Sequence, residues 1–153
     1  MFNIVILQPE IPQNTGNIAR TCACTNSALH LVKPFKFEIT DKALKRAGLD
    51  YWDKVKVFYY DSFEELLEKN SGAELYFIET GSTTRYTDVA YPKNAFLVFG
   101  QETLGIPKNI LAKYKHRMLT VPMANNIRSL NLSNCVALVL YEAFRQQDFN
   151  FKV

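Results

Sequence analysis

Cysteine and histidine are scarce in this sequence, which has three cysteines and two histidines. An odd number of cysteines without an export signal argues against a disulfide framework. Cys22 and Cys24 are too close together for the usual zinc spacing, and His30 and His116 lie far apart in the sequence. We therefore expect no metal site, and we expect all three cysteines to be small buried structural residues.

Long hydrophobic runs are also missing. No segment is long enough to span a bilayer, and residues 1–7 lack the basic flank and length of a signal peptide. No repeat or low-complexity tract interrupts the 153 residues. We expect one domain covering residues 1–153 and a cytoplasmic location.

Acidic residues are absent between Thr103 and Tyr141, and this window contains Lys108, Lys113, Lys115, Arg117 and Arg128. That half of the chain should be electropositive. A second basic stretch, residues 33–60, mixes six lysines and one arginine with Phe35, Phe37, Tyr51 and Trp52. Basic residues among aromatics suit RNA backbone and unstacked bases. Composition leaves a second interpretation open, a solvated helix face with core aromatics.

Short apolar runs that are rich in β-formers recur along the chain, at residues 3–7, 29–32, 55–59, 75–78, 96–99 and 118–121. Strands that are buried on both faces of a parallel sheet have this pattern. Helix signals separate them: Asp41 before residues 42–47 with Gly48 as a stop, a capping box at residues 62–65, and Pro107. The alternation predicts an α/β fold with a mainly parallel sheet flanked by helices.

The last predicted helix, residues 131–146, is apolar on nearly every side. One stripe is formed by Leu132, Val136, Val139, Leu140 and Ala143, and further apolar residues widen it. A terminal helix of a small domain cannot easily bury every side against its own sheet. A second subunit would cover it, although packing under the basic loops is an alternative.

Three segments contain more polar or glycine residues than their local structure requires. The first, residues 12–20, leaves the first predicted strand and enters a helix, with Asn14 as the expected N-cap. Arg20 would then lie a turn or more inside that helix, where its side chain could reach the carboxyl edge of the sheet. A surface arginine is the alternative.

The second segment, residues 99–107, runs from a strand into a loop bounded by Gly100 and Gly105. Glycine there allows backbone to approach a ligand closely. The two glycines have the spacing of a phosphate-binding loop, but Ile106 and Pro107 stand where that motif needs Lys and Ser or Thr. The segment therefore does not indicate a nucleoside triphosphate or a dinucleotide site.

The third segment is a polar loop, residues 124–127, followed by Arg128-Ser129-Leu130-Asn131-Leu132-Ser133-Asn134 before the apolar helix. An N-cap by Ser129 or Asn131 would explain one or two of these side chains. The remaining amides and hydroxyls exceed what capping needs and indicate a ligand site.

In order and spacing, these three segments resemble the motifs of the SPOUT RNA methyltransferases. The opening segment, the run from Arg46 to Tyr51 and residues 129–134 are similar to the short members that methylate the 2′-hydroxyl of cytidine or uridine 34 in leucine tRNAs. The resemblance implies a deep C-terminal trefoil knot, which connection rules alone would exclude. It also implies S-adenosylmethionine as cofactor, a homodimer, and the tRNA anticodon stem-loop as partner.

The resemblance assigns roles to residues. It implies a cofactor site at Ile78, Thr80, Gly100, Glu102, Val121, Met123, Ser129 and Leu130. It gives catalytic roles to Arg20, Asn14, Glu102 and Asn131, and RNA contacts to Arg20, Arg128, Tyr141 and Arg145. Tyr141 could equally be an interface tyrosine.

A sulfonium methyl is already activated, so the expected tasks are alignment of the ribose and removal of its 2′-hydroxyl proton. A guanidinium is a poor base, so we expect Arg20 to orient the ribose and lower the pKa of its hydroxyl. Arg20 would come from one subunit and the cofactor loops from the other. Two alternatives stay open: methylation of another RNA position or a base nitrogen, and a non-catalytic RNA-binding dimer.

Overall fold

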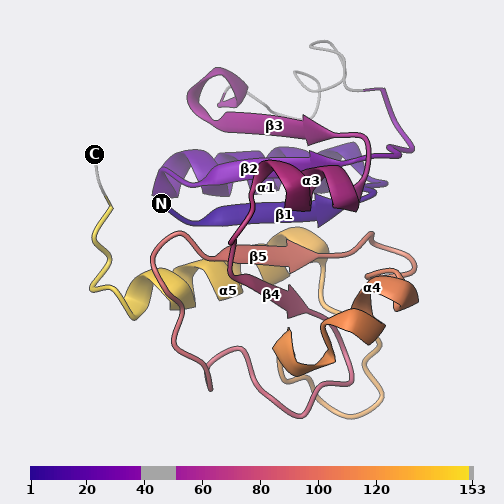
Figure 1. Cartoon of the computed structure of the whole chain (residues 1–153). Coiled ribbons are helices and arrows are strands. Elements are labelled where there is room, and N and C mark those ends of the chain that lie inside the picture. The colour runs from indigo at the N-terminus through magenta and orange to yellow at the C-terminus, as the bar shows by residue number, and fades with distance from the viewer. Residues whose placement is uncertain (39–50, 152–153) are drawn as a thin grey trace.

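The computed structural model describes residues 1–38 and 51–151, and its centre is one sheet of six parallel strands (Figure 1). The strands are β1 (Asn3–Leu7), β2 (Ala28–Val32), β3 (Lys56–Tyr60), β4 (Leu75–Ile78), β5 (Phe96–Phe99) and β6 (Met118–Leu119). Their order across the sheet is β3-β2-β1-β5-β4-β6. The predicted parallel α/β class is confirmed.

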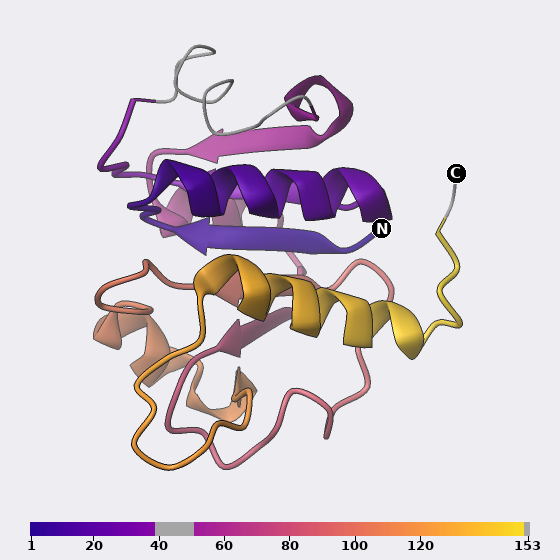
Figure 2. The ribbon, with the colours of Figure 1, turned by 180° about the vertical axis from the view of Figure 1, so that it is seen from behind.

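Helices cover both faces of this sheet. On one face lie α1 (Pro12–Thr25) and α5 (Leu132–Arg145), side by side in Figure 2. On the other lie α3 (Phe63–Lys69) and α4 (Lys108–Lys113). Two short 3-10 helices, η1 (Trp52–Lys54) and η2 (Lys115–Arg117), precede β3 and β6. Each face of the sheet therefore has its own apolar core.

The strand predictions agree with the structure to within two residues at each end. One expectation was wrong: β3 is an edge strand, and Phe58 and Tyr59 are 44% and 42% exposed rather than buried. Apolar composition alone does not distinguish an edge strand with aromatic side chains from a central one. The helix expected at residues 42–47 lies outside the described residues.

Helix starts were predicted with mixed success. The Ser62 hydroxyl accepts the Glu65 N–H at 3.1 Å, and the Glu65 carboxylate accepts the Asp61 N–H at 2.6 Å. The predicted N-cap role of Asn14 is wrong, because α1 begins at Pro12 after Ile11, which makes no side-chain cap. Proline suits the first helical position since its missing N–H would have no helical partner there. The Asn14 side chain is thereby free for tertiary contacts.

Helix α5 buries Val136, Val139, Leu140 and Ala143 against α1 and the sheet. Leu138 and Tyr141 face outward and are 44% and 43% exposed. The helix therefore buries one full face within the chain and leaves a narrower apolar face outside. Within residues 1–38 and 51–151, no helix has the length and apolar character needed to cross a membrane.

Candidate functional site: a cleft at the carboxyl edge of the sheet

A cleft of about 390 Å³ opens where the strands end. Its walls are the loops at residues 78–80, 99–105, 120–123 and 128–132, together with Ile11, Asn14 and Cys135. In a parallel sheet all strand-to-helix loops emerge at one edge, which is where open α/β folds bind ligands. The volume is that of a site for a small organic molecule.

The structure brings most of the predicted site residues together in this cleft. The lining includes all eight predicted cofactor residues: Ile78, Thr80, Gly100, Glu102, Val121, Met123, Ser129 and Leu130. Asn14, Asn131 and Arg128 also line it. Apolar side chains and main chain from three loops thus face polar groups from the starts of α1 and α5.

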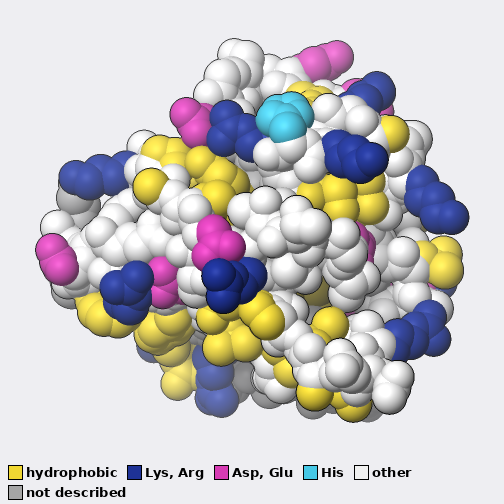
Figure 3. Space-filling model, turned by 90° about the horizontal axis from the view of Figure 1, so that it is seen from below, with side chains coloured by type: hydrophobic (Ala, Val, Ile, Leu, Met, Phe, Trp, Pro, Cys, Tyr) yellow, Lys and Arg dark blue, Asp and Glu magenta, His cyan; other side chains and the backbone are white. Residues whose placement is uncertain are grey.

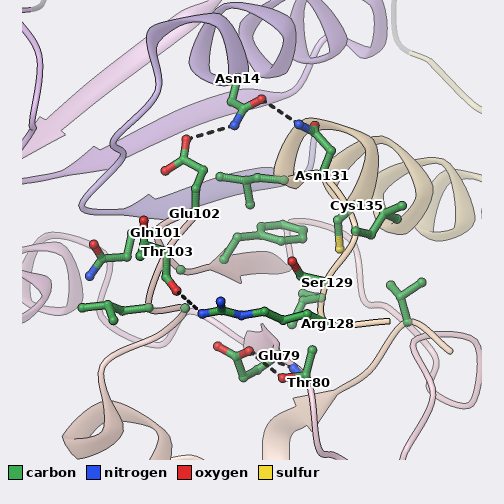
Figure 4. A pocket seen from close by; sticks show the side chains of 18 of the residues that line it. Asn14, Glu79, Thr80, Gln101, Glu102, Thr103, Arg128, Ser129, Asn131 and Cys135 are labelled. Carbon is green, nitrogen blue, oxygen red and sulfur yellow. Dashed lines mark hydrogen bonds between the residues drawn. The ribbon is translucent and has the colours of Figure 1, made fainter. Parts of the chain in front are cut away.

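A chain of hydrogen bonds joins the three sequence segments at the mouth of the cleft (Figure 4). The Asn14 amide donates to the Glu102 carboxylate at 3.1 Å, and the Asn131 amide donates to the Asn14 carbonyl oxygen at 3.1 Å. Asn131 is also the N-cap of α5, since its side-chain oxygen accepts the N–H groups of Ser133 and Asn134. We call Asn14, Glu102 and Asn131 the cleft cluster.

Glu102 ties the loop after β5 to the start of α1. One carboxylate oxygen accepts the Glu10 N–H at 2.9 Å, and the other accepts the Ile11 N–H at 3.1 Å in addition to the Asn14 amide. Backbone N–H groups at a helix start have no helical partner, and a negative charge is stabilised there. Glu102 therefore holds the loop after β5 against the start of α1.

Glu10 makes the reciprocal contact. Its carboxylate accepts the Thr103 N–H at 2.8 Å and pairs with Lys36. The hydrogen bonds from Lys36 and Thr103 lower the pKa of Glu10. Glu102 thus accepts backbone N–H groups at the start of α1, and Glu10 accepts the backbone N–H of Thr103. Together the two carboxylates hold the loop at residues 100–105 against the start of α1.

Glu79, which follows β4, organises the opposite wall. Its carboxylate accepts the Ile106 N–H at 2.8 Å and the Thr80 N–H at 2.9 Å. Gly105 has φ of +70°, and a Cβ there would lie 2.3 Å from a Glu79 oxygen. A Cβ on Gly100 would lie 2.0 Å from the Gly105 carbonyl carbon. Both glycines are required because the loop closes on itself and on Glu79.

Arg20 is not brought into the cleft of its own chain. It is exposed on α1, and its guanidinium carbon lies 4.7 Å from the centre of the Tyr51 ring, a cation–π contact. Tyr141 and Arg145 are also outside the cleft, and Arg145 makes two hydrogen bonds with Glu142, at 2.7 and 2.9 Å. Arg128 lies at the lip, where a guanidinium nitrogen is 3.5 Å from the Thr103 carbonyl oxygen.

The cysteines differ from the expectation in one case. Cys22 is buried, Cys135 is half-buried in the cleft wall, and Cys24 is exposed, so its predicted burial is wrong. Cys24 lies on the outer side of α1, which composition could not reveal. Burial and the nearby Glu79 charge raise the pKa of Cys135 to about 11, so its thiol is protonated at neutral pH.

Sequence reasoning missed Glu10 and Glu79. Each acts through a backbone N–H that is distant in sequence, Thr103 for Glu10 and Ile106 for Glu79. The only local signal was an acidic residue directly after a strand or before a helix. Among residues 1–38 and 51–151, no group of three or more His, Cys, Asp or Glu side chains could hold a metal ion.

A six-stranded parallel sheet with a cleft across its carboxyl edge defines an α/β protein whose backbone loops enclose a space of the size that a small organic molecule fills. The chain belongs to the SpoU rRNA Methylase family, whose model matches residues 1–141. The resemblance to SPOUT RNA methyltransferases is thereby confirmed at the level of the family.

Individual relatives cover nearly the whole chain. A tRNA (cytidine(34)-2′-O)-methyltransferase from Methylovorus glucosotrophus is 46% identical, and the match covers 97% of each protein. A relative from Listeria innocua, provisionally named for the same activity, is 55% identical over 96% of this chain and 89% of its own length. A solved structure concerned with 2-OH methylation of C/U34 on tRNA has a TM-score of 0.91, with 40% identity and 97% coverage of both chains.

Proposed function

We propose that this protein transfers a methyl group from S-adenosylmethionine to the 2′-hydroxyl of nucleotide 34 of tRNA. The observation that carries the proposal is the cleft cluster, in which Asn14, Glu102 and Asn131 join all three segments at one cleft mouth. The relatives named for cytidine 34 methylation support the target. Leucine tRNAs are the substrates that the sequence resemblance favours.

The residues of the cleft fit the cofactor. Its main chain and apolar side chains from Ile78, Val121 and Leu130 suit an adenine ring, and the polar lip suits a charged amino-acid moiety. We propose the eight cofactor residues named from the sequence as the ones that hold it. When bound, S-adenosylmethionine supplies an activated methyl group, so the protein needs no covalent nucleophile.

The cleft cluster would position the ribose. The contacts within it use one of the two N–H donors of each of the Asn14 and Asn131 amides, so each amide keeps a second donor that the cluster does not use. Glu102 accepts three hydrogen bonds, so we assign it a positioning role rather than that of proton acceptor. Fixed amides reduce the entropy lost when the hydroxyl is aligned.

We propose that Arg20 acts in the cleft of a second subunit, where it orients the ribose and electrostatically favours its alkoxide. Its exposure on α1, away from the cleft of its own chain, supports this arrangement. The exposed Leu138 and Tyr141 on the neighbouring α5 would be covered in such a homodimer. Tyr141 and Arg145 then lie at the interface or on the RNA beside it.

We also propose a single domain over residues 1–153, a C-terminal trefoil knot and a cytoplasmic location, where tRNA is modified. The sheet order supports the knot. Because β6 is the outermost strand, the chain after Leu119 must return past the ends of β4 and β5 to begin α5 beside α1. This return path contains cleft residues from Val121 to Leu130.

Calorimetric titration with S-adenosylhomocysteine tests the cofactor. We expect one site per chain with micromolar affinity, and Leu130→Glu should abolish binding without unfolding the protein. The absence of heat at millimolar ligand would reject the enzyme proposal and leave a non-catalytic RNA-binding protein.

Mass spectrometry of tRNA treated with enzyme and cofactor tests the target. We expect one added methyl on the ribose of nucleotide 34, first of all in leucine tRNAs. A methyl at another position or on a base nitrogen would keep the family and reject the substrate. A mixture of Arg20→Ala chains and Leu130→Glu chains should recover part of the activity that each lacks alone, and no recovery would reject the shared site.

A further inference from the structure

The described lysines and arginines differ in whether they pair with a carboxylate. Ion pairs include Lys33, Lys36, Lys69, Arg85, Arg117 and Arg145. None of the ion pairs among the described residues includes Lys108, Lys113 or Lys115. These three exposed lysines lie on and directly after α4, and we call them the α4 lysine surface.

The packing of α4 explains why these lysines point outward. Ile106 and Ile110 are buried in the core on that side of the sheet, and the Tyr114 ring stacks on Phe77 with 4.6 Å between centroids. This inner stripe at intervals of four residues turns the intervening lysines to solvent. The α4 lysine surface therefore has a fixed backbone below it.

The α4 lysine surface begins at the cleft. Lys108 follows the cleft residue Gly105 by three positions, and the exposed Arg128 stands at the lip beside Thr103. In Figure 3 dark-blue side chains flank the visible histidine. Lys108 and Lys113 are about 7.5 Å apart along the helix axis, on the scale of two nucleotides of an RNA strand.

The α4 lysine surface itself has no large exposed apolar side chain. Among the described residues, the exposed large apolar side chains nearest to it in sequence are Leu104 and Ile127, on either side of residues 105–126. Protein interfaces have an apolar or aromatic centre, whereas a phosphate backbone needs only cations. From these observations we infer that the α4 lysine surface binds the phosphate backbone of the RNA whose ribose enters the cleft. The inference rests on the proposed function.

The test compares two triple variants that remove equal charge. The α4 variant combines Lys108→Gln, Lys113→Gln and Lys115→Gln. The control variant combines Lys56→Gln, Lys69→Gln and Lys93→Gln. Lys56 begins β3, Lys69 ends α3 and Lys93 precedes β5, so the control lysines lie at the opposite edge of the sheet. Each variant lowers the formal net charge of +3 to zero.

The measurement is the affinity for full-length tRNA at several salt concentrations. We expect the α4 variant to bind tRNA about 30-fold more weakly at 0.1 M salt. The magnitude of the slope of log K against log salt should also decrease, by about 2 to 3, because each lost phosphate contact releases roughly 0.7 to 0.9 fewer counterions. The control variant should keep the slope of the unaltered protein. Affinity for S-adenosylhomocysteine should not change in either, and thermal unfolding should change only slightly, because the control loses just the exposed Lys69–Glu65 pair.

An unchanged slope in the α4 variant, or an equal decrease in both variants, would overturn the inference. If the triple variant does not fold, each single Lys→Gln change should lower the slope by about 0.7 to 0.9, and no change in any of the three would overturn it. Failure of the proposed function is distinguishable, because the unaltered chain would then leave nucleotide 34 unmethylated while these slopes remain measurable on tRNA.

Discussion

The protein contains two chains of hydrogen bonds between residues that are distant in sequence. One is the cleft cluster, and the other consists of Asn3, His30 and Tyr60, which we call the core cluster. In the core cluster, the two His30 ring nitrogens lie 2.9 Å from the Tyr60 hydroxyl and 3.1 Å from the Asn3 side-chain oxygen. These three residues come from adjacent strands β1, β2 and β3, and none is more than 7% exposed. In the cleft cluster Asn14 is buried, but Asn131 is exposed.

The difference shows what each group contributes. A buried polar group costs stability unless it is bonded, so the core cluster must satisfy itself inside the protein. The cleft cluster sits where backbone loops end and keeps amide donors at a surface that a ligand can reach. We therefore expect changes in the core cluster to affect stability and changes in the cleft cluster to affect activity.

The largest expected effect separates capping from positioning at Asn131. Asn131→Ser keeps an N-cap side chain on α5 but cannot reach Asn14, so methylation should fall on the order of 100-fold while thermal stability is nearly unchanged. Asn131→Ala should lose the same activity and also about 1 kcal/mol of stability. Steady-state methylation and thermal unfolding measure both. Full activity in Asn131→Ser would mean that the contact with Asn14 is dispensable.

A second prediction concerns the core cluster and pH. Burial lowers the pKa of His30 from 6.5 to about 4. At pH values between these two pKa values, His30 binds a proton more readily in the unfolded chain than in the folded chain. The free energy of unfolding should therefore fall by about 2 kcal/mol from pH 7 to pH 5. Urea unfolding at the two pH values measures the change.

His30→Gln is the control for this prediction, since it lowers stability but removes the titrating group. Its free energy of unfolding should be nearly constant over the same interval. An equal decrease in both proteins would assign the effect to other groups. Affinity for S-adenosylhomocysteine at pH 7 should be the same in both.

Glu102→Gln should have a smaller effect. The amide that replaces one carboxylate oxygen leaves a backbone N–H at the start of α1 without its acceptor, at a cost of about 1 kcal/mol. We expect about tenfold weaker binding of S-adenosylhomocysteine, which calorimetry can measure, and a pH–rate profile of unchanged shape. Loss of the acidic limb of that profile would instead identify Glu102 as the proton acceptor.

Glu10→Gln should have the smallest effect. The glutamine carbonyl can still accept the Thr103 N–H, and only the pairing with Lys36 is lost. Binding of S-adenosylhomocysteine should weaken by about threefold, as expected for an exposed lysine partner. Lys36→Gln should match it. A larger loss in Glu10→Gln than in Glu102→Gln would reverse the assigned order of the two carboxylates.

Much of the fold was predictable because strands, helix boundaries and polar excess are local properties. The six strands and the capping box at Ser62 followed from residue patterns, whereas the convergence of the three segments on one cleft was implied by the family resemblance. The position of Arg20 and the exposure of Cys24 did not, because each depends on which side of α1 faces a neighbour. The edge position of β3 depends on the order of strands, which its own residues do not encode.

The sequence by itself determined that amides and hydroxyls stand at the starts of two helices, at Asn14 and Asn131, and that a glycine-bounded loop with Glu102 lies between them. Only the tertiary structure decided that Glu102 bonds to the backbone at the start of α1 and that the Asn131 amide reaches Asn14, 117 residues away. The physical reason is that a hydrogen bond needs its two groups about 3 Å apart, and parallel strand order, not local pattern, brings these loops to the same edge of the sheet.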